Sequence, residues 1–333
     1  MVKILLIPFG QLFGLLTWIR RELYQRGILK RTRMNVHSIV VGNLNVGGSG
    51  KTPFSLWLAT RLAEDRRTAI LSRGYGRKTK GFLQVTAAST AEQVGDEPME
   101  MRLALPEDVP NFVCESRVQG IAQIAHVAPD TQVVVLDDAY QHLALKADKY
   151  VLLCDYHNPF FRDFPMPAGR LREWPCAARY ASCIVVTRCP ADMSPSEALE
   201  WYTRLAKYGC PVFFATYINT DPVSFPVSGA ELPSGPVMAL SALANNRLFY
   251  DYARKYSISR HFMYRDHHVF TAKDAESWKQ HIAVSGAAAI LTTRKDAMRL
   301  QPWFKELPVP VFMTFTHPEF LFEQEDEFIR RVI

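Results

Sequence analysis

Short apolar runs alternate with longer, helix-like stretches along the chain from residue 36 onward. This alternation is typical of an α/β fold, in which helices cover both faces of a mainly parallel sheet. A first group of strands is predicted at residues 38–42, 68–71, 112–115, 132–136, 150–154, 183–187 and 212–216. A second group is predicted at residues 237–240, 261–264, 288–292 and 311–314. We therefore expect a large α/β domain and a second, smaller one.

The amino-terminal segment has a different pattern, with no charged side chain between Lys3 and Arg20. It is slightly short of the ~20 apolar residues that span a bilayer, and Pro8 interrupts it. Cations follow directly, at Arg20, Arg21, Arg26, Lys30, Arg31 and Arg33. This pattern predicts a monotopic helix within residues 1–33 that lies on an anionic membrane surface. A helix packed in the core is the alternative, and the lack of a small-residue cleavage site disfavours a signal peptide.

The composition of the chain bears on its number of domains, its possible partners and its redox compartment. The 333 residues are 48% hydrophobic, enough for about two packed domains. A net charge of +6 suits partners that carry phosphate, whether nucleotides, nucleic acid or lipid headgroups. Outside the amino-terminal segment no basic patch is interleaved with aromatic residues, so we expect no nucleic-acid partner. The six cysteines form no C-x-x-C pair, which disfavours a zinc site or disulfide framework and indicates a reducing, cytoplasmic setting.

The clearest chemistry lies in the run V-G-N-L-N-V-G-G-S-G-K-T-P at 41–53. A strand runs into glycines and a Lys-Thr pair before a helix predicted over 53–63, as in a P-loop that wraps nucleotide phosphates. Asn45 stands where the strict motif has its first glycine, and asparagine tolerates left-handed backbone better than most residues. The alternative is a chance glycine loop before a helix. The predicted nucleotide-binding residues are Asn45, Gly47, Gly48, Ser49, Gly50, Lys51 and Thr52.

A P-loop also needs an acidic residue at the end of a buried strand to hold magnesium. The run Q-V-V-V-L-D-D at 132–138 supplies two, at the carboxyl edge where ligands of parallel sheets bind. The alternative is that these carboxylates are turn and helix-cap residues. We predict a Mg²⁺ site formed by Thr52, Asp137, Asp138 and Glu97. Together the two elements indicate hydrolysis of ATP or GTP, or phosphoryl transfer.

Residues 220–236, between the two groups of strands, are rich in Pro, Ser and Gly and are predicted to form a linker. The predicted organisation is therefore a membrane-interface helix at 1–33, a P-loop core at 34–219 and a second α/β domain at 220–333. We expect the second domain to contribute to the active-site cleft.

The chain resembles the tetraacyldisaccharide 4′-kinases of lipid A biosynthesis. The resemblance rests on blocks in the family's order over nearly the whole chain: the glycine-rich run at 41–53, L-S-R-G-Y-G-R (71–77), V-G-D-E-P (94–98), L-D-D-A-Y-Q-H (136–142), P-A-G-R-L-R-E (167–173), D-H-H (266–268) and T-T-R-K-D-A (292–297). It implies transfer of the γ-phosphoryl group of ATP, with Mg²⁺, to the 4′-hydroxyl of tetraacyldisaccharide 1-phosphate, giving lipid IVA. It also implies a peripheral enzyme at the cytoplasmic face of the bacterial inner membrane, and no obligate protein partner is evident.

The resemblance further implies a catalytic dyad of Asp96 and His267, assisted by Lys51. A carboxylate beside an imidazole gives a base whose pKa can be tuned towards neutrality. Either member could take the proton of the acceptor hydroxyl, and His268 could exchange roles with His267. The alternatives are a helix cap for Asp96 and a solvated loop histidine for His267.

Candidate substrate-binding residues lie in the remaining blocks. Some cations could equally form a solvated, salt-bridged surface. The family's usual D-D-G-F-Q-H differs from this chain at Ala139 and Tyr140, and Ala139 removes any need for positive φ there. The block T-R-K-D is reminiscent of the [NT]-K-x-D motif that reads guanine, but its lysine is displaced by one position. This difference disfavours a guanine-binding site. The predicted substrate-binding residues are Arg73, Tyr75, Arg77, Arg117, Tyr140, Gln141, His142, Arg170, Arg172 and Glu173.

The main rival function is a membrane-associated P-loop ATPase or GTPase switch that acts on a protein partner. A P-loop and an apolar amino-terminal helix are compatible with both functions. The G-D-E-P and D-H-H blocks favour the kinase, because a switch does not need them.

Overall fold

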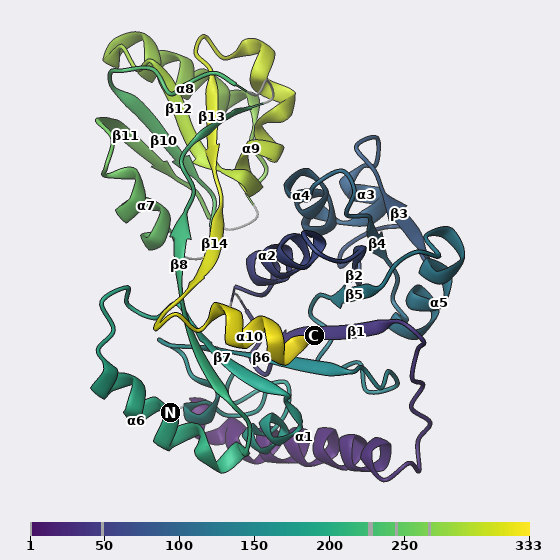
Figure 1. Cartoon of the computed structure of the whole chain (residues 1–333). Helices are drawn as coiled ribbons and strands as arrows, with labels where there is room; N and C mark the ends of the chain where they lie inside the picture. Colours follow the sequence, from purple (N-terminus) through teal and green to yellow (C-terminus); the bar gives the residue numbers. More distant parts are fainter. Residues whose placement is uncertain (1, 48–49, 226–228, 244–245, 266–267) are drawn as a thin grey trace. The chain divides into compact units, whose positions relative to one another are not determined.

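The computed structural model describes residues 2–47, 50–225, 229–243, 246–265 and 268–333 (Figure 1). The chain forms two compact units, which are described separately. Unit 1 comprises Met1–Tyr217 and Pro318–Ile333, and unit 2 comprises Ile218–His317. The chain passes between the units near the ends of β8 (Val212–Asn219) and β14 (Thr316–Phe320). Unit 1 is thus formed by two separate stretches of the chain, and unit 2 is the continuous stretch between them.

Unit 1 is built on a large sheet with the strand order β14-β8-β7-β6-β1-β5-β2-β4-β3. Neighbouring strands from β8 to β4 pair in parallel, and β3 pairs antiparallel with β4. The carboxyl ends of these parallel strands therefore meet at one edge. The strands not yet bounded are β1 (His37–Asn43), β2 (Thr68–Ser72), β3 (Leu83–Val85), β4 (Asn111–Val113), β5 (Val133–Leu136), β6 (Lys149–Asp155) and β7 (Cys183–Thr187).

The central strands carry apolar side chains on both faces of the sheet. Helices cover both faces and bury these side chains. On one face Ile39 and Val135 belong to a buried cluster with residues of α2, α4 and α10. On the other face Val40 and Leu136 belong to a cluster with residues of α5 and α6. The helices are α2 (Lys51–Ala63), α3 (Ala91–Val94), α4 (Asp96–Ala104), α5 (Arg117–Val127), α6 (Pro195–Leu205) and α10 (Glu325–Val332), with short 3₁₀ helices at Phe160–Arg162, Pro175–Tyr180 and Ala206–Tyr208.

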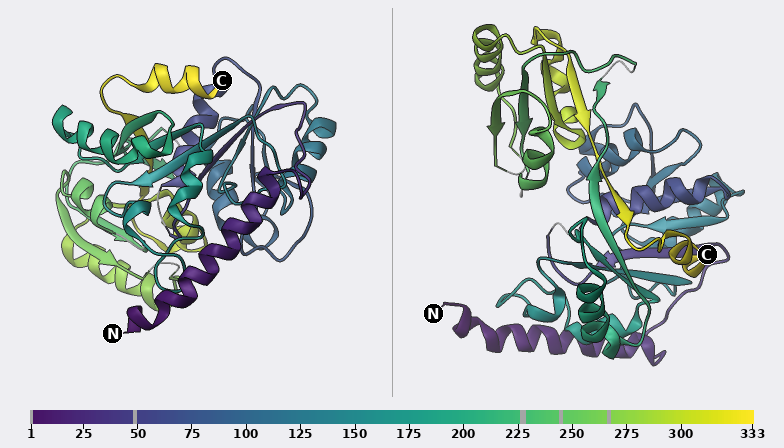
Figure 2. Two further views of the ribbon diagram at one scale, coloured as in Figure 1. Left: turned by 90° about the horizontal axis from the view of Figure 1, so that it is seen from below. Right: turned by 60° about the vertical axis from the view of Figure 1, so that its left-hand side comes forward.

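The amino-terminal helix α1 spans Val2–Gln25 without a break, and Pro8 lies inside it rather than interrupting it (Figure 2). Gly10 and Gly14 face the loop 165–174: a Cβ on Gly10 would meet the Pro165 carbonyl oxygen at 2.7 Å, and Gly14 lies directly against the Trp174 ring. Small residues on this face let the helix approach the loop closely. Among the residues that the structure describes, no helix has both the length and the apolar character needed to cross a membrane.

Unit 2 has its own mixed sheet, with the strand order β11-β10-β12-β13-β9. Its strands are β9 (Val223–Phe225), β10 (Val237–Ser241), β11 (Ile258–Met263), β12 (Ala289–Thr293) and β13 (Val311–Thr314), and its helices are α7 (Arg247–Ala253), α8 (Ala272–Ser285) and α9 (Arg294–Leu300), with a 3₁₀ helix at Gln301–Glu306. The predicted linker contains β9, which pairs antiparallel with β13.

The fold class predicted from the sequence is confirmed: a large, mainly parallel sheet flanked by helices, a smaller second sheet and an amino-terminal helix. Every predicted strand occurs, with ends that differ by a few residues at most. The short strands β3, β9 and β14 were not predicted. Each carries polar residues and pairs at or near an edge, where the apolar pattern is weakest.

Candidate functional site

The predicted P-loop connects β1 to α2 in unit 1. Gly47 and Gly50 have φ values of 106° and 78°, in the left-handed region that favours glycine. Asn45 forms an isolated antiparallel bridge with Leu171, and its side-chain amide nitrogen lies 3.5 Å from an oxygen of Asp163. Gly48 and Ser49 lie outside the described residues. Thr52 is the second residue of α2, so its hydroxyl stands at the amino-terminal end of that helix.

Three parallel neighbours, β1, β5 and β2, bring the P-loop, the acidic pair and Arg73 to the same edge of the sheet. The first acidic residue, Asp137, is 3% exposed and accepts a hydrogen bond of 2.7 Å from the Ser55 hydroxyl of α2. Burial, followed by the negative charges of Glu97 and Asp138, raises the pKa of Asp137 to about 7. These carboxylates therefore form an acidic group that a cation would stabilise.

The second acidic residue, Asp138, is held by Arg172 in a two-pronged ion pair with N···O distances of 2.9 and 3.0 Å. The ammonium group of Lys51 lies 3.9 Å from the same carboxylate. Gln141 accepts a hydrogen bond from Arg172 at 3.2 Å and donates one to the Asn43 carbonyl at 2.9 Å. This network joins the strand end to the P-loop.

The turn after β5 contains a left-handed residue, but this residue lies one position before Ala139. Ala139 is buried, and the preceding residue Asp138 adopts the left-handed conformation, with φ of 44°. Aspartate tolerates this conformation better than most side chains. The turn therefore keeps a left-handed residue without a glycine, and the same backbone directs the Asp138 carboxylate towards Arg172.

Arg117 was predicted to bind phosphate, but it is 2% exposed and serves the protein itself. Its guanidinium donates to the carbonyls of Asp137 and Cys114 at 3.0 and 3.1 Å. Burial lowers the pKa of Arg117 to about 10, so it stays cationic at neutral pH. The arginine thus joins the residues that directly follow β4 and β5, and its contact with phosphate stays a prediction.

His142 lies beside Arg117 and accepts a hydrogen bond of 3.2 Å at Nε2 from the Arg117 backbone N–H. This contact assigns the proton of the neutral ring to Nδ1. Burial, and then the positive charges of Arg117, Arg20 and Arg73, lower the pKa of His142 to about 4. The ring is therefore neutral at physiological pH.

Three further predicted substrate residues have internal partners. The Tyr140 side chain is buried, and its hydroxyl donates to the Ala177 carbonyl at 2.8 Å. Glu173 is buried in an ion pair, and the Arg77 guanidinium pairs with Glu115 at 2.6 Å with its side chain only 2% exposed. Tyr140, Glu173 and Arg77 thus each have a partner within the protein, and their substrate contacts stay a prediction.

The S-R-G-Y-G-R loop lies against the G-D-E-P block. A Cβ on Gly95 would meet the Tyr75 carbonyl oxygen at 2.8 Å, and the Lys78 N–H donates to the Glu92 carbonyl. Arg73 and Tyr75 are exposed here. Asp96 and Glu97, also exposed, are the first two residues of α4. The structure thus brings Asp96 close in the fold to Tyr75 within unit 1.

Of the D-H-H block, Asp266 and His267 lie outside the described residues. His268 is described and has structural partners: its Nε2 lies 3.1 Å from Asp274, and its ring stacks on Tyr264 with centroids 4.5 Å apart. Asp274 also caps the start of α8. These contacts hold His268 in the fold of unit 2 and argue against exchanging its role with His267.

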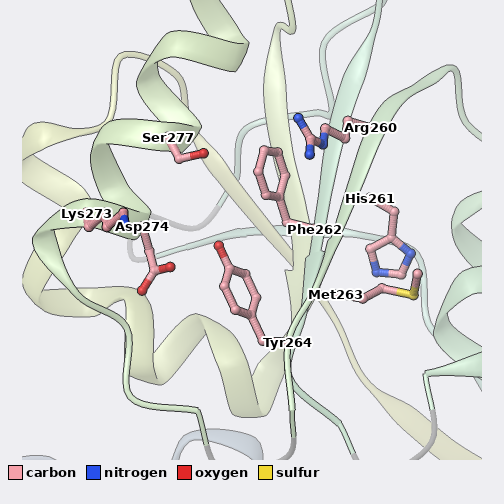
Figure 3. Close-up of a pocket in the computed structure, with 8 residues that line it drawn as sticks. All are labelled: Arg260, His261, Phe262, Met263, Tyr264, Lys273, Asp274 and Ser277. Atoms are coloured by element: carbon pink, nitrogen blue, oxygen red, sulfur yellow. The ribbon is translucent and has the colours of Figure 1, made fainter.

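Unit 2 also contains the T-R-K-D block, whose carboxylate is not available to read a base. Asp296 is completely buried and accepts hydrogen bonds from the Ala242 N–H and the Thr293 hydroxyl. A separate pocket of about 540 Å³ lies between β11 and α8, where Figure 3 shows Tyr264 and Asp274 on facing elements. Among the predicted site residues that the structure describes, none lines it.

A larger cavity of about 740 Å³ opens beside α1 in unit 1. Its wall includes Leu6 of α1, His157, Arg162 at the end of a 3₁₀ helix, and Arg170, which donates to Asn158 at 2.9 Å. Asp163 contributes to the same wall and also contacts Asn45 of the P-loop. This cavity combines an apolar side with cations, and its lining includes one of the predicted site residues, Arg170.

Several residues at the carboxyl edge were not predicted. Asp155 is the last residue of β6 and directly follows the strand predicted at 150–154; it pairs with Arg188 at 2.8 Å and caps the next turn. Its position after a strand was a signal that sequence reasoning could have used. Tyr217 donates to the Gly50 carbonyl at 2.8 Å, and Arg21 of α1 pairs with Glu173. These two contacts join residues far apart in sequence, so no local pattern announces them.

Within the described part of the chain, no three side chains among His, Cys, Asp and Glu gather as a complete metal site. All six cysteines are free.

The chain matches a family model, LpxK, tetraacyldisaccharide-1-P 4′-kinase, over residues 2–332. It is 35% identical to a tetraacyldisaccharide 4′-kinase of Cytophaga hutchinsonii over 308 residues, which cover 92% of this chain and 88% of that protein. It is 37% identical to one of Flavobacterium johnsoniae over 305 residues, covering 90% and 88%. A similar solved structure is the "apo" form of LpxK from Aquifex aeolicus in complex with ATP, with a TM-score of 0.77, 30% identity and coverage of 100% and 98%.

Proposed function

The chain belongs to the tetraacyldisaccharide-1-P 4′-kinase family, and from that premise we propose that ATP is its phosphoryl donor and that Asn45 and residues 47–52 hold the phosphates. As a member of this family it is a phosphotransferase that makes a lipid A precursor. The observation that carries the proposal is the network of Lys51, Asp138 and Arg172, which joins the P-loop to the end of β5.

Phosphate binding would use the open amino-terminal end of α2. Backbone N–H groups at the start of a helix are unpaired, and the helix dipole favours a negative charge there. The Lys51 ammonium lies 3.5 Å from the Gly47 carbonyl and 3.9 Å from Asp138. These long contacts are ones that a phosphate oxygen could replace. Lys51 would then neutralise the transferred group.

Magnesium fits the oxygen donors at this edge of the sheet. Mg²⁺ is usually held by one or two carboxylates together with substrate phosphates, so a complete protein cage is not required. The raised pKa of Asp137, caused by burial and then by Glu97 and Asp138, is the observation that favours a cation here. Thr52, Asp137, Asp138 and Glu97 are the proposed ligands, of which one or two carboxylates would hold the ion together with Thr52 and the phosphates. When bound, Mg²⁺ would neutralise charge on the phosphates.

We assign acceptance of the hydroxyl proton to Asp96 and His267 acting together. Asp96 stands at the start of α4, on the same edge of unit 1 as the P-loop strand. The engagement of His268 with Asp274 and Tyr264 leaves His267 as the imidazole of the D-H-H block for this role. An imidazole and a carboxylate in contact can share the proton as it leaves the alcohol.

The acceptor lipid would be held from the side of α1. Exposed Arg73 and Tyr75, together with Gln141, Arg170 and Arg172, are proposed to contact the phosphorylated disaccharide. Arginine suits this role because its guanidinium binds phosphate in a two-pronged geometry. The cavity that Arg170 shares with Leu6 adds an apolar wall near these cations.

Membrane association is proposed from the two faces of α1. Gly10, Gly14 and Arg21 mark the packed face. The opposite face exposes an apolar stripe at Leu5, Phe9, Leu12, Leu16 and Ile19. Exposed cations follow at Arg20, Arg26, Lys30 and Arg33. An amphipathic helix with flanking cations lies in the interface of an anionic bilayer, here the cytoplasmic face of the bacterial inner membrane.

The test is incubation with Mg²⁺, ATP labelled on its γ-phosphate, and tetraacyldisaccharide 1-phosphate in micelles, followed by chromatography of the lipid fraction. We expect label in the lipid, and a loss of at least ~100-fold in rate for Lys51→Ala. Lys207→Ala, which changes an exposed lysine of unit 1, is the matched control and should retain the rate. Label released solely as free phosphate would overturn the proposal in favour of the nucleotide switch.

A further inference from the structure

Arg21 is one of the largest fully buried side chains of the structure, although it lies within the basic run that follows the apolar segment. Its Nε and Nη2 atoms pair with both oxygens of Glu173 at 2.5 and 2.7 Å. Nη2 also donates to the Tyr140 carbonyl at 3.1 Å. The guanidinium lies over the Tyr140 and Tyr180 rings, at 5.0 and 5.5 Å from their centroids.

These contacts hold together two segments of the chain that lead into the proposed nucleotide site. Tyr140 stands two residues after Asp138, and Glu173 directly follows Arg172. Asp138 and Arg172 form the two-pronged ion pair beside Lys51. One side chain of α1 thus fixes the backbone on both sides of that ion pair, without touching the pair itself.

The geometry of these contacts explains why residue 21 is an arginine. A planar guanidinium can bond a carboxylate with two donors and a carbonyl with another, which an ammonium group on a flexible stem cannot do in one geometry. A buried ion pair is weak evidence for a contribution to stability, because removing both charges together is often neutral. The Arg21–Glu173 pair would contribute mainly by fixing the positions of the segments that it joins.

We propose that Arg21 is a positioning residue for phosphoryl transfer, acting through Glu173 and the Tyr140 carbonyl on the Asp138–Arg172 pair. This inference rests on the proposed function, in which those two residues belong to the nucleotide and acceptor site. It also gives α1 a second role, because its outer face meets the bilayer while its inner face orders the site.

The test compares wild type with Arg21→Met/Glu173→Met, which removes the buried charges as a unit. Arg204→Met, which removes one partner of an exposed pair on α6, is the control. We expect the double variant to keep a thermal midpoint near that of wild type and to lose about 10- to 100-fold in kcat, since small misplacements of reacting groups cost that much. The KM for ATP should change less than kcat.

A second background separates positioning from general damage. In an Arg172→Lys enzyme the two-pronged pair is already broken, so adding the double change should lower kcat by less than about threefold, because coupled sites are not additive. An equal loss in both backgrounds would overturn the positioning role, and so would a stable double variant as active as wild type. A wild-type enzyme that leaves the lipid unlabelled would instead overturn the proposed function.

Discussion

Replacing His142 with Gln should make unit 1 less sensitive to acid. The folded state keeps His142 neutral, because burial and the charges of Arg117, Arg20 and Arg73 lower its pKa from 6.5 to about 4. In the unfolded chain the ring binds a proton below pH 6.5. Between pH 6.5 and 4 the unfolded state therefore binds more protons, and stability falls as the pH falls through that window.

The magnitude follows from the shift. At about 1.4 kcal/mol per pKa unit, lowering the pKa of His142 to about 4 corresponds to about 3 kcal/mol over the full window. The ring is partly exposed, so solvent screening reduces this to about 1–2 kcal/mol, of which about 1 kcal/mol is lost by pH 5. Above pH 7 the ring is neutral in both states and contributes no such term.

The assay is urea unfolding of wild type and His142→Gln at pH 7.5, 6 and 5, with the difference in unfolding free energy followed against pH. A glutamine oxygen can still accept from the Arg117 N–H, so the variant retains an acceptor at that position. His126→Gln, which changes an exposed histidine in the last turn of α5, is the control. Parallel pH profiles for wild type and His142→Gln would refute the reasoning, as would an NMR titration of His142 with its midpoint near 6.5.

Three other outcomes test the proposed mechanism. Asp96→Asn and His267→Gln should each lower kcat by ~100-fold or more while ATP binding, measured by calorimetry, changes little; near-normal turnover in both would remove the dyad. Gly50→Ala should weaken ATP binding at least tenfold, because φ is 78° and a Cβ would lie 2.5 Å from a tyrosine hydroxyl oxygen, and unchanged affinity would contradict this view of the loop. Leu12→Gln/Leu16→Gln should reduce sedimentation with anionic vesicles and leave the thermal midpoint unchanged, since both side chains are exposed; full sedimentation would argue against the interfacial helix.

Local sequence patterns were sufficient where one segment carries all the information. The P-loop is a strand, a glycine turn and a helix in one continuous run, and Asp137 directly ends a strand that is apolar throughout. Parallel strands place their carboxyl ends together, so the meeting of these two segments followed from the fold class. The fold class was therefore predictable from the sequence, and so was the edge of the sheet at which the nucleotide is proposed to bind.

Residues 172 and 173 show where such patterns fail. Arg172 and Glu173 are adjacent in a loop, and their side chains take different directions: Arg172 meets Asp138, and Glu173 enters the protein interior. The partner of Glu173 lies 152 positions away in α1. Without the position of α1, nothing in the sequence distinguishes the side chain at the site from the one that supports it.

The arginines of the site illustrate the same physical limit. A guanidinium near a strand end can bind phosphate or can satisfy backbone carbonyls, and residue type does not separate the two roles. Arg117 is committed to the carbonyls of Cys114 and Asp137, whereas Arg73, also after a strand, remains exposed. The choice depends on which carbonyls the packing leaves without a donor, and that is a property of the tertiary structure.

The basic run after the apolar segment divides in the same way. Arg20 and Arg21 are adjacent and carry the same charge, yet Arg20 is exposed and Arg21 is almost completely buried. A helix turns by about 100° per residue, so Arg21 shares a face with Gly14 while Arg20 lies nearer the outer apolar stripe. Reading the cations as one membrane-binding group therefore assigns Arg21 to the wrong side of the helix. Under the proposal that Arg21 positions the Asp138–Arg172 pair, the orientation of α1 becomes a condition for the geometry of the site.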